Sequence, residues 1–110
     1  MKETIKAVVK NWSLVTIKDE LSPFQIVWGV IDECDEREYK KGDYLCSSRV
    51  FSIKNSHMRT LTGSCYRLIG EGSEYVCSYV QLISLIDGLS PEELQLKKIR
   101  AGVSPLELYK

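Results

Sequence analysis

The sequence predicts one α+β domain over residues 1–110, with a β-rich middle and short helices at the N- and C-terminal ends. Its 110 residues are too few for two ordinary domains, and a composition of 44% hydrophobic and 27% charged residues is typical of a globular chain. Short runs rich in Val, Ile, Tyr and Trp alternate with turn residues between positions 25 and 78, and helix signals flank them. We therefore expect about five antiparallel strands in a small sheet, curled like an open SH3- or OB-type barrel.

At the N-terminus we expect a short helix that leads into a strand. Apolar residues within 5–12 recur at the i, i+3, i+4, i+7 spacing of one helix face. The run 14–17 that follows has strand character, and Ser22-Pro23 then interrupts the chain. Residues 25–32 indicate a buried strand because they are rich in Ile, Val and Trp, and Gly29 marks a bulge or a close backbone approach within it.

A hairpin is expected around the charged segment 33–43, which ends in the turn signal Lys41-Gly42-Asp43. Residues 44–53 alternate between apolar and polar well enough to form its second strand, paired with 25–32. A loop at 55–57 follows that strand.

Two short strands, at 59–62 and 65–69, lead into a glycine-rich turn at 70–72. A hairpin register centred on this turn places Cys65 directly opposite Cys77. Cross-strand Cβ separations come close to disulfide geometry. We nevertheless expect thiols, because a cytosolic chain is kept reduced.

The C-terminal part predicts a strand to about Ser78 and a helix over 80–87 that ends at Gly88. A second helix begins at 90–93, where Ser is the N-cap, Pro takes the first helical position and two acids follow. The segment 104–107 repeats this start signal. The core residues predicted by this arrangement are Trp28, Val30, Val50, Leu68, Val76, Val80 and Ile83.

Cysteine and histidine usage argues against metal and catalytic sites. The four cysteines include no C-x-x-C pair, and His57 is the only histidine, so we expect no metal and no cofactor. The acidic run 32–38 lacks the spacing of a calcium loop and is expected to be a solvated hairpin tip. There is no phosphate loop or nucleophile elbow, and Cys46 with His57 is the one conceivable nucleophile pair, so we predict a protein that is not an enzyme.

Location and assembly follow from the same chain. The longest apolar run has six residues, far below a membrane span, and no apolar stretch follows the N-terminal lysines as in a signal peptide. We therefore expect a cytoplasmic protein that does not bind membranes. A homodimer is the expected assembly, through an exposed strand edge or through apolar residues in 106–109.

Charges of opposite sign are segregated along a chain with 15 basic and 15 acidic residues. The stretch 44–70 contains no acid, whereas 19–38 contains seven acids and one base. A basic sheet surface with aromatic residues would suit single-stranded nucleic acid, and an acidic tip would suit a basic protein. The candidate interaction surface comprises Arg49, Lys54, Arg59, Arg67, Tyr44, Tyr66, Asp35, Glu36 and Glu38.

Two local resemblances bear on function. The segments Val27–Val30, 42–48 and 66–72 together resemble a group of small uncharacterised bacterial, phage and mobile-cassette proteins. This resemblance implies a compact accessory protein that binds and modulates a larger partner. Residues 99–109, which include Ala-Gly-Val-Ser, resemble the turn and recognition-helix start of helix-turn-helix regulators, although Lys98 stands where those proteins normally have Ala.

The function predicted from these observations is a small non-enzymatic protein-binding module, such as an inhibitor, an immunity factor or an anti-defence factor. Its partner is a protein that the sequence does not identify. The alternative is a nucleic-acid-binding protein that uses either the basic and aromatic sheet surface or the C-terminal helix-turn-helix-like segment.

Overall fold

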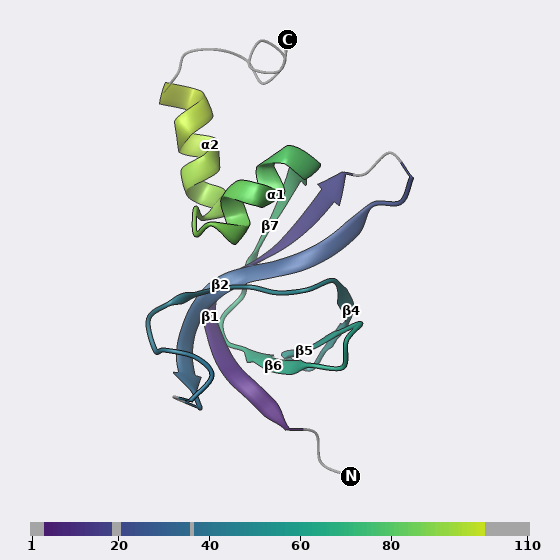
Figure 1. The fold of residues 1–110 in the computed structure, drawn as a ribbon, viewed down its shortest axis with the longest axis vertical. Coiled ribbons are helices and arrows are strands. Elements are labelled where there is room, and N and C mark those ends of the chain that lie inside the picture. The colour runs from purple at the N-terminus through teal and green to yellow at the C-terminus, as the bar shows by residue number, and fades with distance from the viewer. Residues whose placement is uncertain (1–3, 19–20, 36, 101–110) are drawn as a thin grey trace.

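The computed structural model describes residues 4–18, 21–35 and 37–100, which form a mixed sheet with two helices at one end (Figure 1). The predicted helix start at 104–107 and most of the helix-turn-helix-like segment lie outside the described residues. In chain order the elements are β1 (Ile5–Lys18), β2 (Phe24–Cys34), β3 (Tyr44–Cys46), β4 (Val50–Lys54), β5 (His57–Thr60), β6 (Cys65–Leu68), β7 (Ser73–Ser78), α1 (Tyr79–Ile86) and α2 (Pro91–Arg100).

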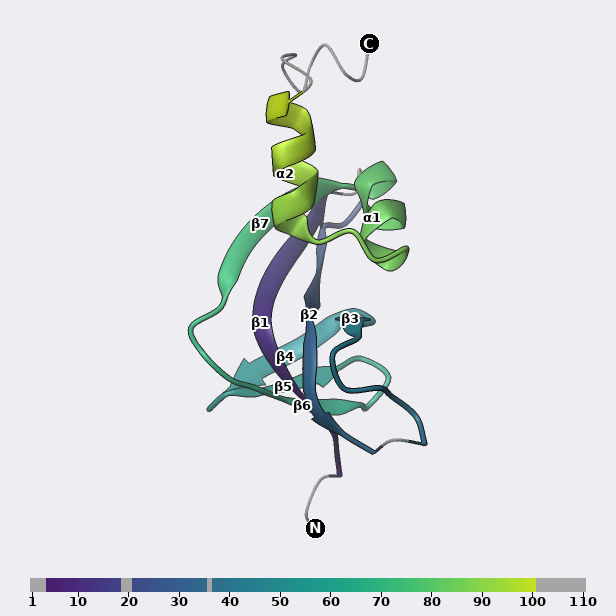
Figure 2. The same cartoon turned by 90° about the vertical axis from the view of Figure 1, so that its left-hand side faces the viewer.

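Strand β1 is the centre of this sheet. It pairs with β2 in antiparallel orientation, and on its other side it pairs in parallel with β6 along its first half and with β7 along its second half. Figure 2 shows β7 running beside the upper part of β1, with the helices at that end. The strand order is β3-β2-β1-β6-β5-β4, with β7 as an additional partner of β1.

Three fold predictions are corrected by this topology. The sheet has seven strands and is mixed rather than antiparallel. It also remains open, because the outer strands β3 and β4 are not paired with each other, so the predicted barrel is wrong. No helix forms at the N-terminus, since residues 5–18 are strand β1. The sheet-rich plan with C-terminal helices is confirmed.

The helix-like spacing near the N-terminus has its origin in a bulge in β1. Lys10 is paired with Val30 and Ser13 with Trp28, so two residues of β1 face the single residue Gly29 of β2. One extra residue in a strand shifts its alternation, and side chains at odd positions before and after it then point to opposite faces. The bulge therefore interrupts the alternation of a regular strand, and the buried residues on its two sides no longer follow a period of 2.

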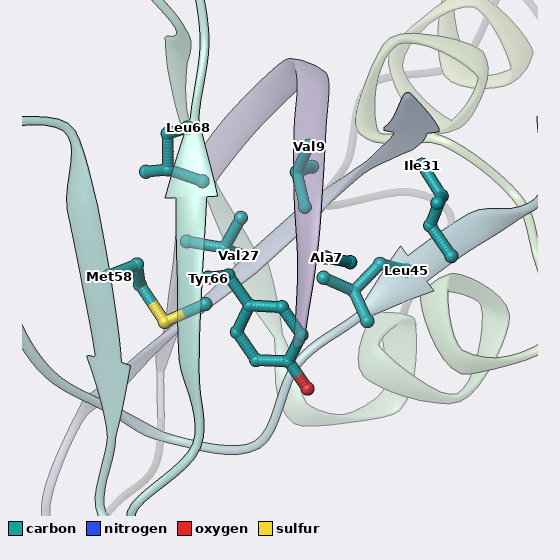
Figure 3. Close-up of a cluster of buried hydrophobic side chains, with 8 residues drawn as sticks. All are labelled: Ala7, Val9, Val27, Ile31, Leu45, Met58, Tyr66 and Leu68. Carbon is teal, nitrogen blue, oxygen red and sulfur yellow. The ribbon is translucent and has the colours of Figure 1, made fainter. Parts of the chain in front are cut away.

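This shift buries the two halves of the sheet on opposite faces. In the lower half, Ala7 and Val9 of β1 join a cluster with residues from β2, β3, β5 and β6 (Figure 3). In the upper half, Val15 and Ile17 belong to a second cluster, which the helices cover. The buried residues of the first cluster are Ala7, Val9, Val27, Ile31, Leu45, Met58, Tyr66 and Leu68, and those of the second are Val15, Ile17, Ile26, Trp28, Cys77, Leu85 and Leu94.

Strand β2 alternates regularly from Phe24 to Ile31, before a second register shift at Asp32, and contributes to both clusters. Its odd-numbered Val27 and Ile31 lie in the first cluster, whereas its even-numbered Ile26 and Trp28 lie in the second. A strand that is buried on both faces needs a nearly continuous apolar sequence. This explains why residues 25–32 are so apolar, as the sequence analysis expected.

We expect Gly29→Ala to destabilise the fold. A Cβ atom at Gly29 would overlap Cγ1 of Val9 and lie 3.2 Å from the backbone oxygen of Lys10. Overpacking of this kind costs about 1–3 kcal/mol of unfolding free energy. Urea unfolding of Gly29→Ala, Val9→Ala and the double variant measures it. The double variant should lose less than the sum of the single variants, and a Gly29→Ala protein as stable as wild type would contradict the close approach.

The link between β6 and β7 is not the predicted hairpin turn. Both strands run in the same direction along β1, so Cys65 is aligned with Ile5 and Cys77 with Ile17. The prediction that Cys65 lies opposite Cys77 is therefore wrong, and the two form no disulfide. Strands β6 and β7 do not pair with each other as a hairpin, because each pairs with β1, one after the other along its length.

Trp12 holds this link in place. Its indole N–H donates a hydrogen bond to the backbone oxygen of Gly70 at 3.2 Å. The link also contains Gly72, which has a φ of +74°, and a Cβ atom there would overlap the Trp12 ring. Only a glycine meets both conditions at Gly72, because L-residues rarely adopt this φ and no space remains for a side chain.

The matched pair Gly72→Ala and Gly70→Ala separates these two effects. Gly70 has a φ of +85° but open space around it, so its substitution costs backbone strain alone, about 1 kcal/mol. Gly72→Ala adds the overlap with Trp12 and should lose at least a further 1 kcal/mol of unfolding free energy. Thermal and urea unfolding of both variants measure the difference. Equal losses would show that the Trp12 ring is not packed on Gly72.

Both C-terminal helices begin at a serine cap, and the sequence predicted the one at Ser90. Ser78 and Gln81 form a capping box at α1, with Ser78 Oγ accepting from the Gln81 N–H at 3.2 Å. At α2, Ser90 Oγ accepts from the backbone N–H of Glu93 at 3.1 Å, as the Ser-Pro-Glu-Glu signal predicts.

The predicted core is correct in part. Trp28 and Leu68 are buried, and Val30 and Val50 are half-buried beside the clusters. However, Val76, Val80 and Ile83 are each more than half exposed, so their prediction as core residues is wrong. They were assigned to the core because they are apolar, whereas the face that a helix buries depends on the sheet it packs against.

The predicted second strand of the hairpin, 44–53, is divided in two. Strand β3 pairs with β2 as expected, and Ser47 continues that pairing by hydrogen bonds of 2.9 Å to both backbone groups of Val27. The chain then leaves β2, and β4 pairs with β5 at the other edge of the sheet. The short strands expected at 59–62 and 65–69 correspond to β5 and β6.

Candidate interaction surfaces

A row of basic residues crosses strands β4, β5 and β6 on one face of the sheet. Lys54 is the register partner of His57, and His57 is the partner of Arg67. Arg59 lies in the next row, opposite Ser52. All four basic side chains are exposed, whereas the alternating residues Met58 and Tyr66 point into the first cluster. We call Lys54, His57, Arg59 and Arg67 the basic face.

Among the described residues, the sheet row of the basic face reaches an acidic side chain on β2. Past Arg67 the same row continues with Val8 of β1 and then Glu33 of β2. Further along β2, Asp32 forms an ion pair with Lys10 at 3.6 Å. Strands β4 to β6 carry no acid at all, so the positive charge is concentrated on three strands.

The two tyrosines expected on this surface lie elsewhere. Tyr66 is buried, its ring meets Tyr39 edge to face, and the two hydroxyls lie 3.0 Å apart. Burial raises the pKa of the Tyr66 hydroxyl well above its usual value, and the hydrogen bond to Tyr39 adds to this. Tyr44 stacks on Trp28 with ring centroids 5.8 Å apart and donates its hydroxyl to the backbone oxygen of Ile86. Tyr66 is therefore not free to stack on a base, and Tyr44, although 41% exposed, lies on β3, which is at the opposite end of the strand order from β4.

Arg49 is also separate from the basic face. It precedes β4, and its guanidinium lies over the Phe24 ring, 4.2 Å from the centroid, at the start of β2. A cation–π contact of this kind anchors the segment between β3 and β4. Phe51 is an exposed aromatic residue near the basic face, 65% exposed at the bulge of β4.

The acidic candidates lie in the turn between β2 and β3. Asp35 accepts two side-chain hydrogen bonds from Arg37, at 3.1 and 2.9 Å, and these hold the pKa of the Asp35 carboxyl below its usual value. The net charge of this turn is thereby reduced. Glu38 is exposed, and Glu36 lies outside the described residues.

The conceivable Cys46–His57 pair is not assembled. Three strands lie between β3 and β5 in the sheet order, and His57 Nδ1 is within 2.8 Å of the backbone oxygen of Asn55. Burial also raises the pKa of the Cys46 thiol to about 11, which is opposite to what an activated nucleophile needs.

Cys46 should therefore resist alkylation in the folded protein. With a pKa of about 11 its thiolate fraction at pH 8 is about one in a thousand, and reactivity should rise with pH until that value is passed. Iodoacetamide labelling followed by peptide mass spectrometry, in buffer and in urea, measures this. Rapid labelling of Cys46 at pH 8 without urea would contradict the buried, protonated thiol.

A groove of about 810 Å³ lies between the β1 bulge, the link 69–73 and the start of α2. Its rim carries Lys10 together with the acids Glu71, Glu92 and Glu93. The capping box of Ser90 and Glu93 already occupies backbone N–H groups at this end of α2. Because the charges of the rim are mixed and these N–H groups are already hydrogen-bonded, the groove does not favour any one class of ligand.

Helix α1 exposes an apolar face that the sequence analysis missed. Tyr79, Val80, Ile83 and Ile86 lie within one side of the helix and are each exposed by more than half, whereas Gln81 and Leu85 are buried. Val76 of β7, just before the helix, is 57% exposed. The sequence could have indicated this face, because α1 is apolar on nearly every side and a helix that buries one side leaves the other apolar side chains exposed.

Comparison with known proteins produces no relative. No family model matches the chain, and neither a curated protein nor a solved structure is significantly similar to it. In the part of the chain that the structure describes, no helix is long and apolar enough to cross a membrane. Within those same residues, no three His, Cys, Asp or Glu side chains are grouped to hold a metal ion.

Proposed function

We propose that the protein is a small non-enzymatic protein-binding module, of a bacterial or mobile-element accessory type, that docks through the exposed apolar face of α1. The observation that carries this proposal is the group Tyr79, Val80, Ile83 and Ile86, all more than half exposed on one side of a short helix. Single exposed apolar residues are ordinary, but a contiguous group is typical of interaction sites. The resemblance to accessory proteins supports the same function.

The helix is presented rigidly, which favours binding. Its first turn is fixed by the Ser78 capping box. Its last turn accepts the Trp28 indole N–H at the backbone oxygen of Leu85, at 3.1 Å, and the Tyr44 hydroxyl at Ile86. A surface that is already ordered loses little conformational entropy on binding.

The chemistry of the partner follows from the border of this face. Glu74 shares the exposed side of β7 with Val76, and Asp87 caps the end of α1. The matching surface is therefore an apolar groove with a basic rim, which accepts the helix as amphipathic helices are accepted in grooves.

The test compares Val80→Ser/Ile83→Ser with the control Ile5→Ser/Leu61→Ser. Both remove two exposed apolar side chains without changing charge, but the control changes residues 40% and 61% exposed on β1 and just after β5. Each variant is immobilised and challenged with a bacterial lysate. The proposal expects a protein retained by wild type and control but lost by the α1 variant, with Kd raised at least about tenfold once that protein is purified.

Two outcomes would contradict the proposal. One is an identical set of retained proteins for wild type and the α1 variant. The other is a wild-type dimer in light scattering that becomes a monomer only in Val80→Ser/Ile83→Ser. That result would assign the face to a second copy of this chain, in a homodimer that differs from the strand-edge or 106–109 dimer expected from the sequence.

A further inference from the structure

We infer that the basic face of β4, β5 and β6 binds the phosphodiester backbone of a nucleic acid. This activity is separate from docking by α1, because the two surfaces share no residue and lie on different elements. The residues that would contact the phosphates are Lys54, His57 and Arg67, which form one row, and Arg59 in the adjacent row.

The strand register places these groups at a spacing that suits phosphates. Adjacent strands are about 4.8 Å apart, so Lys54 and Arg67 lie about 10 Å apart across β5. Arg59 and Arg67 are diagonal neighbours, about 7–8 Å apart at Cα. Long exposed side chains at this spacing reach successive phosphates along one strand, and guanidinium groups bind phosphate through paired hydrogen bonds.

The surroundings favour a polyanion over an acidic protein. Protein interfaces have an apolar or aromatic centre, but the register partners among these basic groups are Ser52 and the buried Cys65, and the exposed Phe51 lies to one side at the bulge of β4. A phosphate backbone needs no such centre. The chain has a formal net charge of zero, so attraction has to come from this local concentration of charge.

The same geometry predicts binding with little sequence preference. Tyr66 lies in the first cluster and Tyr44 lies on β3, with three strands between it and β5, so neither offers a platform for bases beside the basic face. Only Phe51, 65% exposed beside Arg59, is placed to contribute stacking near these groups in the described part of the chain. Backbone contacts without base contacts fix position but do not specify sequence.

Fluorescence anisotropy with labelled oligonucleotides tests this inference. The probes are a single strand of about 20 nucleotides and the duplex of the same sequence, titrated at several salt concentrations. Contacts from Lys54, Arg59 and Arg67 imply that affinity falls about 20-fold for the single strand, or about 40-fold for the duplex, between about 50 and 200 mM salt. The tighter of the two probes identifies the form of nucleic acid that fits the face.

Matched variants locate the binding. Arg59→Ser/Arg67→Ser should weaken binding at least tenfold at low salt and flatten its salt dependence to that of a single contact. The control Lys18→Ser/Arg37→Ser removes the same charge at exposed residues elsewhere and should stay within twofold of wild type. Lys54→Glu, at an exposed residue in the row, should also weaken binding and provides a second test if the arginine variant unfolds.

Three results would overturn the inference. The first is no salt-dependent binding of either oligonucleotide. The second is an equal loss of affinity in the control and the arginine variant, which would show that binding depends on overall charge and not on the basic face. The third is binding of polyglutamate as tight as that of the oligonucleotides at the same salt, which would assign the face to an acidic polypeptide. None of these results bears on docking by α1, which Val80→Ser/Ile83→Ser tests separately.

Discussion

The close approach of β1 and β2 at Gly29 is the constraint on which the rest of the structure depends. Two residues of β1, Asn11 and Trp12, face that single glycine, and Asn11 takes a φ of +49°. The extra residue reverses the alternation of β1 and places its two halves in different cores. The bulge also coincides with the point at which β1 changes partner from β6 to β7, between Val9 and Ser13, where Trp12 bonds to Gly70.

The two candidate surfaces are consequences of this arrangement. In the lower half, Met58 and Tyr66 point into the first cluster, and the opposite face of β4, β5 and β6 carries the exposed basic residues around the buried Cys65. In the upper half, α1 buries its own Leu85 in the second cluster with Trp28 and leaves Ile83 outward. The protein thus has a polar, cationic surface at one end and an apolar one at the other, and each suits a different class of partner.

Local signals were sufficient where short-range chemistry determines structure. Ser90 and Ser78 are caps because their side chains satisfy N–H groups three residues later, and this depends on nothing distant in the chain. The basic residues were likewise recognisable from the absence of acids over 44–70. By contrast, the ring contacts of Tyr44 and Tyr66 could not be recognised locally, because their partners Trp28 and Tyr39 are distant in sequence.

The sequence by itself determined the strands near 25–32 and 65–69, the helix starts, the buried character of 25–32 and the segregation of charge, because these depend on residue type and spacing over a few positions. Only the tertiary structure decided which strands pair with β1, on which face each half is buried, and that Val80 and Ile83 face outward. The physical reason is that one extra residue at a bulge reverses every subsequent side chain, and neither its position nor a strand's partner is encoded in local periodicity.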